Sequence, residues 1–279
     1  MGTSASSNGP GSGVSLDPPW LDDIGDDNVA SSPSENDVNG NSQGVSQPEE
    51  PQQISPIAPK GRFSSARRNM GEYVRSGSRD SLRRSLGHYS KTGMGGAKAA
   101  SQRMRVSARV GANLFNTFRS LRDDPNFSLG KALSDLKARG ADARQIIRAI
   151  VEQVCPRGGS LDEISLKNSA TSALSEYLEE HPDIDFTSLS DDQMWELTGT
   201  YLGNEIFERV QMDIGQAFER VDISFAERVN RLNDMKAFIQ TDVSVQLNRI
   251  RDTESKTVNI QKLIQNTIRA TFEIYEGAV

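Results

Sequence analysis

Apolar side chains recur at helical spacing along most of the chain after residue 60. The three clearest stripes repeat every three or four residues, which places the members of each stripe on one face of an α-helix. They are Ala100, Met104, Ala108, Gly111, Phe115 and Phe118; Ile206, Val210, Ile214 and Phe218; and Ile260, Ile264, Ile268, Phe272 and Tyr275. No long stretch alternates apolar and polar residues as a strand would. The pattern therefore predicts an all-α fold, an irregular helical bundle.

Further helices are predicted from start and stop signals. The hydroxyl and carboxyl or amide side chains of a capping box satisfy backbone amides at a helix start, and two such boxes stand at Ser160 with Glu163 and at Ser190 with Gln193. Ser128 is expected to cap a helix that ends at Gly140. Together these signals predict helices over 64–75, 78–90, 128–139, 142–156, 160–181 and 225–250.

Charge divides the chain into three blocks. Residues 1–59 hold nine acids and no Lys or Arg, residues 60–122 hold fifteen bases and two acids, and residues 123–279 hold 27 acids and 17 bases. The first block is too poor in apolar residues to offset its ordering entropy, so we expect a disordered acidic tail. The second is predicted to be a basic helical arm whose short helices need a partner surface. The third is predicted to be an α-helical interaction domain.

The chemistry needed for catalysis is sparse. One cysteine, Cys155, and two histidines, His88 and His181, are too few for a disulfide or a zinc site. The glycine-rich run 93–98 lacks the Lys-Ser/Thr ending of a phosphate-binding loop. We therefore expect no enzyme, no metal and no cofactor. Because no apolar run of about eighteen residues and no secretion signal occurs, we expect a cytoplasmic protein without membrane contact.

Cations in the second block are predicted to form a basic surface. The candidates are Arg67, Arg68, Arg83, Arg84, Lys98, Arg105 and Arg109. Such a field attracts phosphates or acidic protein surfaces. Because the aromatic residues nearby are scattered and form no known reading motif, nucleic acid stays a possible but unsupported partner.

The N-terminus offers a candidate modification site. A Met followed by Gly2 is normally trimmed, and the exposed glycine amine has an intrinsic pKa of about 7.7 to 8.0, so part of it is nucleophilic near neutral pH. The same residues also fit a plain unmodified leader. Further along, Pro18, Pro19 and Trp20 stand among acids, which is typical of a short docking motif or of a chance cluster.

Several short motifs, taken in order, resemble one family. They are the small-residue start Met1–Ser7, Gly9–Gly11, Pro18–Trp20, Ser65–Arg68 and Ser81–Ser85. With the acidic spacer, the Arg-rich entry and the helical C-terminal part, this order resembles the QatB family, the B component of bacterial Qat anti-phage defence systems. The resemblance extends over the whole chain.

The resemblance implies a function among partner proteins. Qat systems also contain an ATPase (QatA), a QueC-like enzyme (QatC) and a TatD-like nuclease (QatD). QueC-like enzymes activate a 7-deazaguanine carboxylate with ATP and pass it to a nitrogen nucleophile, and Gly2 stands at the matching position. The implied role is a scaffold and substrate in the bacterial cytoplasm, with Thr3, Ser4, Pro18, Pro19 and Trp20 recognised in the tail.

Two alternatives lie outside this family. Met1-Gly2 with Ser6 also fits N-myristoylation, with the basic block as the second membrane signal that a single acyl chain needs. That hypothesis requires a eukaryotic host, or a pathogen protein that such a host acylates. The other alternative is a basic nucleic-acid-binding adaptor, whose binding would depend on salt and on Lys98, Arg105 and Arg109.

Overall fold

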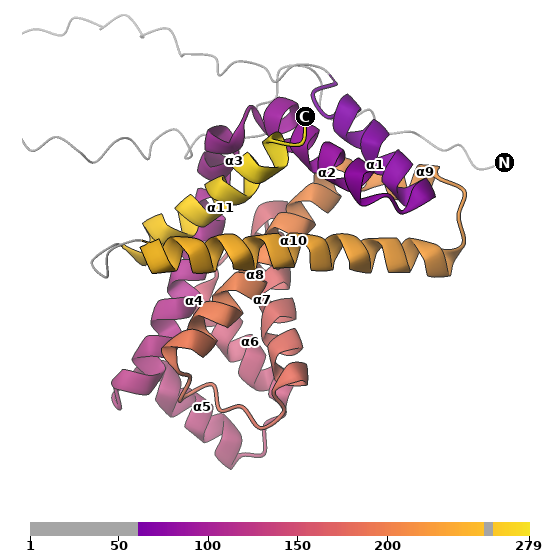
Figure 1. The fold of residues 1–279 in the computed structure, drawn as a ribbon. Helices are drawn as coiled ribbons and strands as arrows, with labels where there is room; N and C mark the ends of the chain where they lie inside the picture. The colour runs from indigo at the N-terminus through magenta and orange to yellow at the C-terminus, as the bar shows by residue number, and fades with distance from the viewer. Residues whose placement is uncertain (1–60, 254–258) are drawn as a thin grey trace, which may run out of the picture. The chain divides into compact units, whose positions relative to one another are not determined.

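Every regular element that the structure describes is a helix (Figure 1). The computed structural model describes residues 61–253 and 259–279, and these ranges contain no strand, which confirms the all-α prediction. The expected tail over 1–59 lies outside them. The helices are α1 (Ser64–Ser76), α2 (Arg79–His88), the π-helix η2 (Tyr89–Met94), α3 (Ala97–Arg103), α4 (Arg105–Asp123), α5 (Ser128–Ala138), α6 (Ala143–Val154), α7 (Leu161–Glu180), α8 (Asp191–Ile214), α9 (Gln216–Arg220), α10 (Phe225–Thr253) and α11 (Ile260–Glu276).

Both predicted capping boxes are present. At the start of α7, Ser160 Oγ accepts a hydrogen bond from the Glu163 amide, and the Glu163 carboxylate accepts one from the Ser160 amide. Ser190 and Gln193 make the same reciprocal pair at the start of α8. A third box begins α6. These starts are therefore fixed by residues three positions apart in the sequence.

The prediction that Ser128 caps a helix was wrong. Phe127 is the N-cap of α5, and its side chain makes no capping hydrogen bond to the first turn. In the turn before α5, the Asp124 side chain accepts a hydrogen bond from the Asn126 amide. The predicted end of this helix is confirmed, because Gly140 follows α5 with a φ of 74°, a conformation that glycine adopts without steric cost.

The apolar stripe over 100–118 is divided between two helices. Met104 lies between α3 and α4 with φ −92° and ψ 21°. Its amide still donates to the Ala100 carbonyl, and its carbonyl still accepts from the Ala108 amide, both at 3.0 Å. The stripe thus bends without losing these two hydrogen bonds, and Met104 stays fully buried.

One hydrophobic core joins the first helices to the rest of the described chain. Helix α8 packs on α4, α7 and α10, and α11 packs on α2, α3, α4 and α10 (Figure 1). Helix α1 packs on α2 and α9. The surface that the short Arg-rich helices need therefore belongs to the same chain, and the boundary that we drew at residue 122 falls inside one compact unit, Arg62–Val279.

Candidate interaction surface

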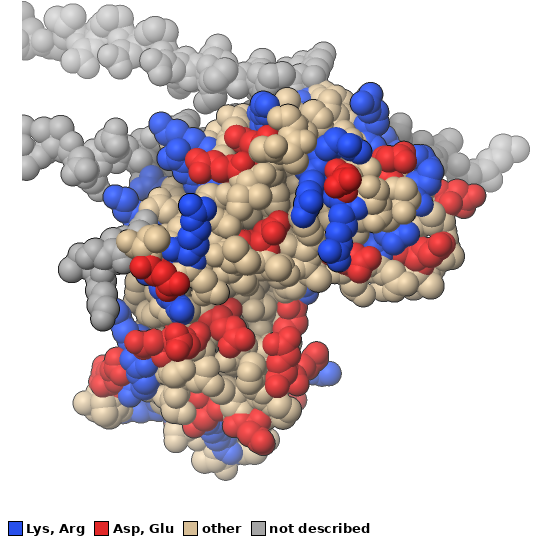
Figure 2. Space-filling view, in the orientation of Figure 1, with Lys and Arg blue, Asp and Glu red and all other residues tan. Residues whose placement is uncertain are grey.

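The cations predicted to form a basic surface all lie on the first four α-helices. Arg67 and Arg105 are half-buried, and the other five side chains are exposed. Their positions are Arg67 and Arg68 on α1, Arg83 and Arg84 on α2, Lys98 on α3, and Arg105 and Arg109 on α4. In the face shown in Figure 2, Lys and Arg gather toward the end that carries α1 and α2, whereas Asp and Glu predominate lower in the view.

Two of these arginines hold helices together. Arg67 Nη2 donates a hydrogen bond of 3.0 Å to the Asp213 carbonyl of α8, and its guanidinium lies 5.9 Å from the centre of the Phe63 ring. The Arg83 guanidinium of α2 lies 5.7 Å from the centre of the Phe238 ring of α10. Both positions are typical of cation–π contacts. Substituting either residue therefore removes packing as well as charge.

Three other cations are available to a ligand. Arg68, Lys98 and Arg109 have no hydrogen-bond acceptor and no carboxylate partner among residues 61–253 and 259–279. Their side chains are exposed. The donors of these three side chains therefore face solvent and can bind an anionic partner.

A groove between α1 and α9 concentrates positive charge. It has a volume of about 720 Å³ and is lined by four arginines, Arg67, Arg68, Arg75 and Arg220. The acid that lines it, Glu72, lies 2.8 Å from Arg75 Nη1. We call this cavity the arginine groove. Its lining charges sum to a positive value, so it favours an anionic occupant.

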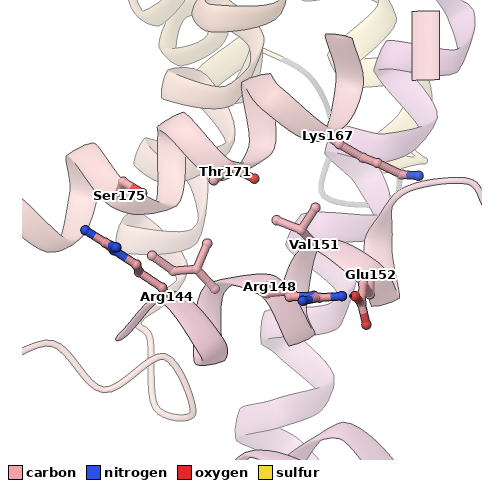
Figure 3. A pocket seen from close by; sticks show the side chains of 8 residues that line it. Arg144, Arg148, Val151, Glu152, Lys167, Thr171 and Ser175 are labelled. Atoms are coloured by element: carbon pink, nitrogen blue, oxygen red, sulfur yellow. The ribbon is translucent and has the colours of Figure 1, made fainter. Parts of the chain in front are cut away.

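A second groove lies between α6 and α7 (Figure 3). Its volume is about 550 Å³, and its cations are Arg144, Arg148 and Lys167. Arg148 Nε pairs with the Glu152 carboxylate at 2.8 Å, and Lys167 Nζ donates to the Gly158 carbonyl at 3.1 Å. Two of its three cations are thus already engaged within the chain, which makes it a weaker anion site than the arginine groove.

The most unusual polar residue is a buried carboxylate, Glu205 of α8, which is fully inaccessible. It accepts hydrogen bonds from three serines, Ser107 at 2.9 Å, Ser165 at 3.3 Å and Ser169 at 3.0 Å. Burial raises the pKa of Glu205 above its ordinary value, an effect that Arg209 and the hydroxyls oppose. Because Glu205 lines neither groove, its hydrogen bonds serve to join α4, α7 and α8.

Sequence reasoning missed Glu205. The sequence did contain a sign of this buried acid, because Glu205 directly precedes Ile206, a residue predicted to lie in the core. An acid that is buried at such a position needs hydrogen-bond donors from other helices. The donors themselves come from segments 36 to 98 residues away.

The thiol of Cys155, a candidate nucleophile, is also buried. Burial raises the pKa of the Cys155 thiol to about 12, so the thiol is protonated at neutral pH and is a poor nucleophile. Within the described ranges no group of three or more His, Cys, Asp or Glu side chains is placed to hold a metal ion. Nor is any helix there long and apolar enough to cross a membrane.

The predicted tail residues lie outside the described part of the chain. These are Gly2, Thr3, Ser4, Pro18, Pro19 and Trp20. The modification site and the tail recognition residues therefore stay predictions from the sequence.

Fold and surface define an all-α protein with a basic face and a cationic groove. Residues 95–275 match the family model described as QatB, Qat anti-phage system associated protein QatB. The match covers more than half of the chain, so the chain belongs to the QatB family, which confirms the family predicted from the sequence; the short motifs over 1–85 lie before the matched residues. No significant match was found among the curated proteins or among the solved structures.

Proposed function

We propose that this chain is a non-catalytic Qat component that acts as a scaffold for partner proteins and as the substrate of a modification at Gly2. The observation that carries the proposal is membership of the QatB family over residues 95–275. Membership of an anti-phage system implies partner proteins. The buried thiol of Cys155 and the enclosed carboxylate of Glu205 support a role without catalysis.

The proposed modification is an amide between Gly2 and a 7-deazaguanine. The QueC-like partner, QatC, joins the deazaguanine carboxylate to the α-phosphate of ATP, which gives an acyl-adenylate and releases pyrophosphate. After Met1 is removed, the Gly2 nitrogen attacks the activated carboxyl carbon, AMP leaves, and the nitrogen loses a proton. A glycine amine suits this step because it carries the least bulk and because its intrinsic pKa of about 7.7 to 8.0 leaves a nucleophilic fraction.

The proposed scaffold role assigns the helical unit to protein partners in the bacterial cytoplasm. The partners are the QueC-like enzyme QatC and the ATPase QatA, with the TatD-like nuclease QatD as a third. Exposed cations without partners in the described chain, such as Arg68 and Lys98, support binding to acidic protein surfaces. Co-purification of a tagged chain from its operon tests this half: QatC and QatA are expected in the eluate, and their absence under mild salt contradicts it.

Intact-mass analysis tests the modification. Chain expressed with QatC is expected to be heavier than chain expressed alone by the mass of one deazaguanine amide, and an inactive QatC is the matched control. An unmodified glycine terminus beside active QatC contradicts the proposal. A mass increase equal to a myristoyl chain, with membrane retention lost in Gly2→Ala, would instead establish N-myristoylation.

A further inference from the structure

We propose that the arginine groove binds an acidic peptide segment of a partner protein, with apolar residues of that segment on the floor of the groove. This inference rests on the scaffold role proposed above. It places the binding of one partner in the groove between α1 and α9. The ligand would be a segment in which carboxylates flank small aliphatic side chains.

Two arginines of the groove have N–H donors that are available to a ligand. Arg68 is exposed and has no polar partner among residues 61–253 and 259–279. Arg220 makes one contact of 3.5 Å, to its own helix neighbour Gln216, which is at the limit of a hydrogen bond. Guanidinium groups bind carboxylates through two parallel hydrogen bonds. Arg68 and Arg220 can therefore each hold one carboxylate of a ligand.

Arg67 is oriented before any ligand arrives. One terminal nitrogen is held by the Asp213 carbonyl at 3.0 Å, and its buried Nε has no hydrogen-bond partner in the described chain. The first turn of α1 beside it has no side-chain cap and no acidic residue, so its free amides add positive potential. Holding a cation in place reduces the ordering cost of binding.

The floor of the groove favours a peptide over nucleic acid. Gly71, Ala217 and Val221 form apolar lining between the arginines, where an aliphatic side chain can be buried. Among the residues that the structure describes, no aromatic ring lines the groove, so bases of a single strand would have no stacking platform there.

Gly71 allows the groove to be blocked without changing its charge. A Cβ placed on Gly71 lies 3.9 Å from Val221 Cγ2 and has no other neighbour within 4 Å outside its own helix in the described part of the chain. Alanine therefore fits in ordinary contact. A methionine at the same position extends into the space that a ligand side chain would occupy.

Fluorescence anisotropy with the full chain tests the proposal. The probe is a fluorescein-labelled peptide of Asp and Glu around a central Leu pair, and duplex DNA of similar charge is the competing probe. The double variant R68E/R220E is expected to bind the peptide at least about tenfold more weakly, and G71M at least about fivefold more weakly. The control K131E/R139E, whose two charges are exposed on and beside α5, should stay within about twofold.

Two results overturn the proposal. One is peptide binding unchanged by R68E/R220E and by G71M in variants that keep the far-ultraviolet spectrum of the parent. The other is that the parent chain binds the duplex more tightly than the peptide and that R68E/R220E and G71M lose this duplex binding. That result would make the groove a nucleic-acid site. Neither result bears on Gly2, whose modification is read separately from the mass of the chain, so failure here is distinguishable from failure of the proposed function.

Discussion

Ser107 of α4 donates a hydrogen bond of 2.9 Å to the buried carboxylate of Glu205 in α8. Ser165 and Ser169 of α7 donate to the second carboxylate oxygen at 3.3 and 3.0 Å. Hydroxyl donors from two helices thus compensate part of the cost of removing this carboxylate from water. The cluster fixes how α4 and α7 meet α8, the helix against which α10 also packs.

Removing the carboxylate should destabilise the fold. We expect Glu205→Ala to lower the free energy of unfolding by about 3–5 kcal/mol, because it leaves buried hydroxyls without acceptors and removes the buried one of the two carboxylates near Arg209, the other being Asp162. Glu205→Gln keeps one acceptor and should cost about 1–3 kcal/mol. Urea unfolding followed by circular dichroism measures both. The exposed acid Glu179 is the control, and an equal loss in Glu179→Ala would contradict a special role for Glu205.

The same residue predicts how stability depends on pH. Burial raises the pKa of Glu205 above 4.5, its ordinary value, so the folded chain holds this proton more tightly than the unfolded chain. The associated stabilisation is complete below the unfolded pKa and is lost as pH rises through the higher folded pKa. The unfolding free energy of the parent minus that of Glu205→Gln should therefore fall as pH rises above about 4.5. If this difference in unfolding free energy grew with pH, the pKa of Glu205 would be lowered by folding and not raised.

Cys155 should be unreactive in the folded chain. Burial raises the pKa of its thiol to about 12, so almost no thiolate exists near pH 8. We expect reaction with Ellman's reagent to be more than about a hundredfold slower in buffer than in urea. Cys155→Ala provides the blank. Fast, complete labelling of the folded chain would show that the thiol is exposed or activated.

Two glycines inside helices should respond oppositely to alanine. A Cβ on Gly87 of α2 would lie 2.5 Å from the Tyr275 carbonyl of α11, and backbone atoms cannot move aside cheaply, so Gly87→Ala should destabilise by about 1–3 kcal/mol. A Cβ on Gly71 of α1 meets Val221 at 3.9 Å. Gly71→Ala should therefore stabilise by about 0.5–1 kcal/mol through helix propensity. Parallel urea titrations check the pair, and stabilisation by both would refute the close approach of α2 and α11.

Local signals in the sequence were enough for most of the helices. The capping boxes at Ser160 and Ser190 and the apolar stripe over 260–275 depend on residues three or four positions apart, and the structure confirms them. The stripe over 206–218 was expected on one helix, which was wrong: α8 ends at Ile214, and Phe218 lies on α9. The break at Met104 was missed, because the apolar period continues through it and the bend keeps its hydrogen bonds. The π-helix η2 was missed as well: it begins at Tyr89, inside the helix expected over 78–90, and continues to Met94.

The surface was less predictable, because it depends on residues that are far apart in the sequence. Arg67 and Arg83 were expected only as surface cations, yet they contact Asp213 and Phe238 on later helices. The arginine groove exists because α9 lies beside α1 and brings Arg220 to it. Counting charge along the chain located the basic block but not the cavity within it.

The mass of the N-terminal peptide tests the central claim most directly. The chain is purified from the intact operon and from the same operon with QatC inactivated, and the peptide is sequenced by tandem mass spectrometry. We expect Met1 to be absent and the Gly2 nitrogen to carry a deazaguanine amide only in the preparation from the intact operon. A free Gly2 amine in both preparations, or a retained Met1, would contradict it.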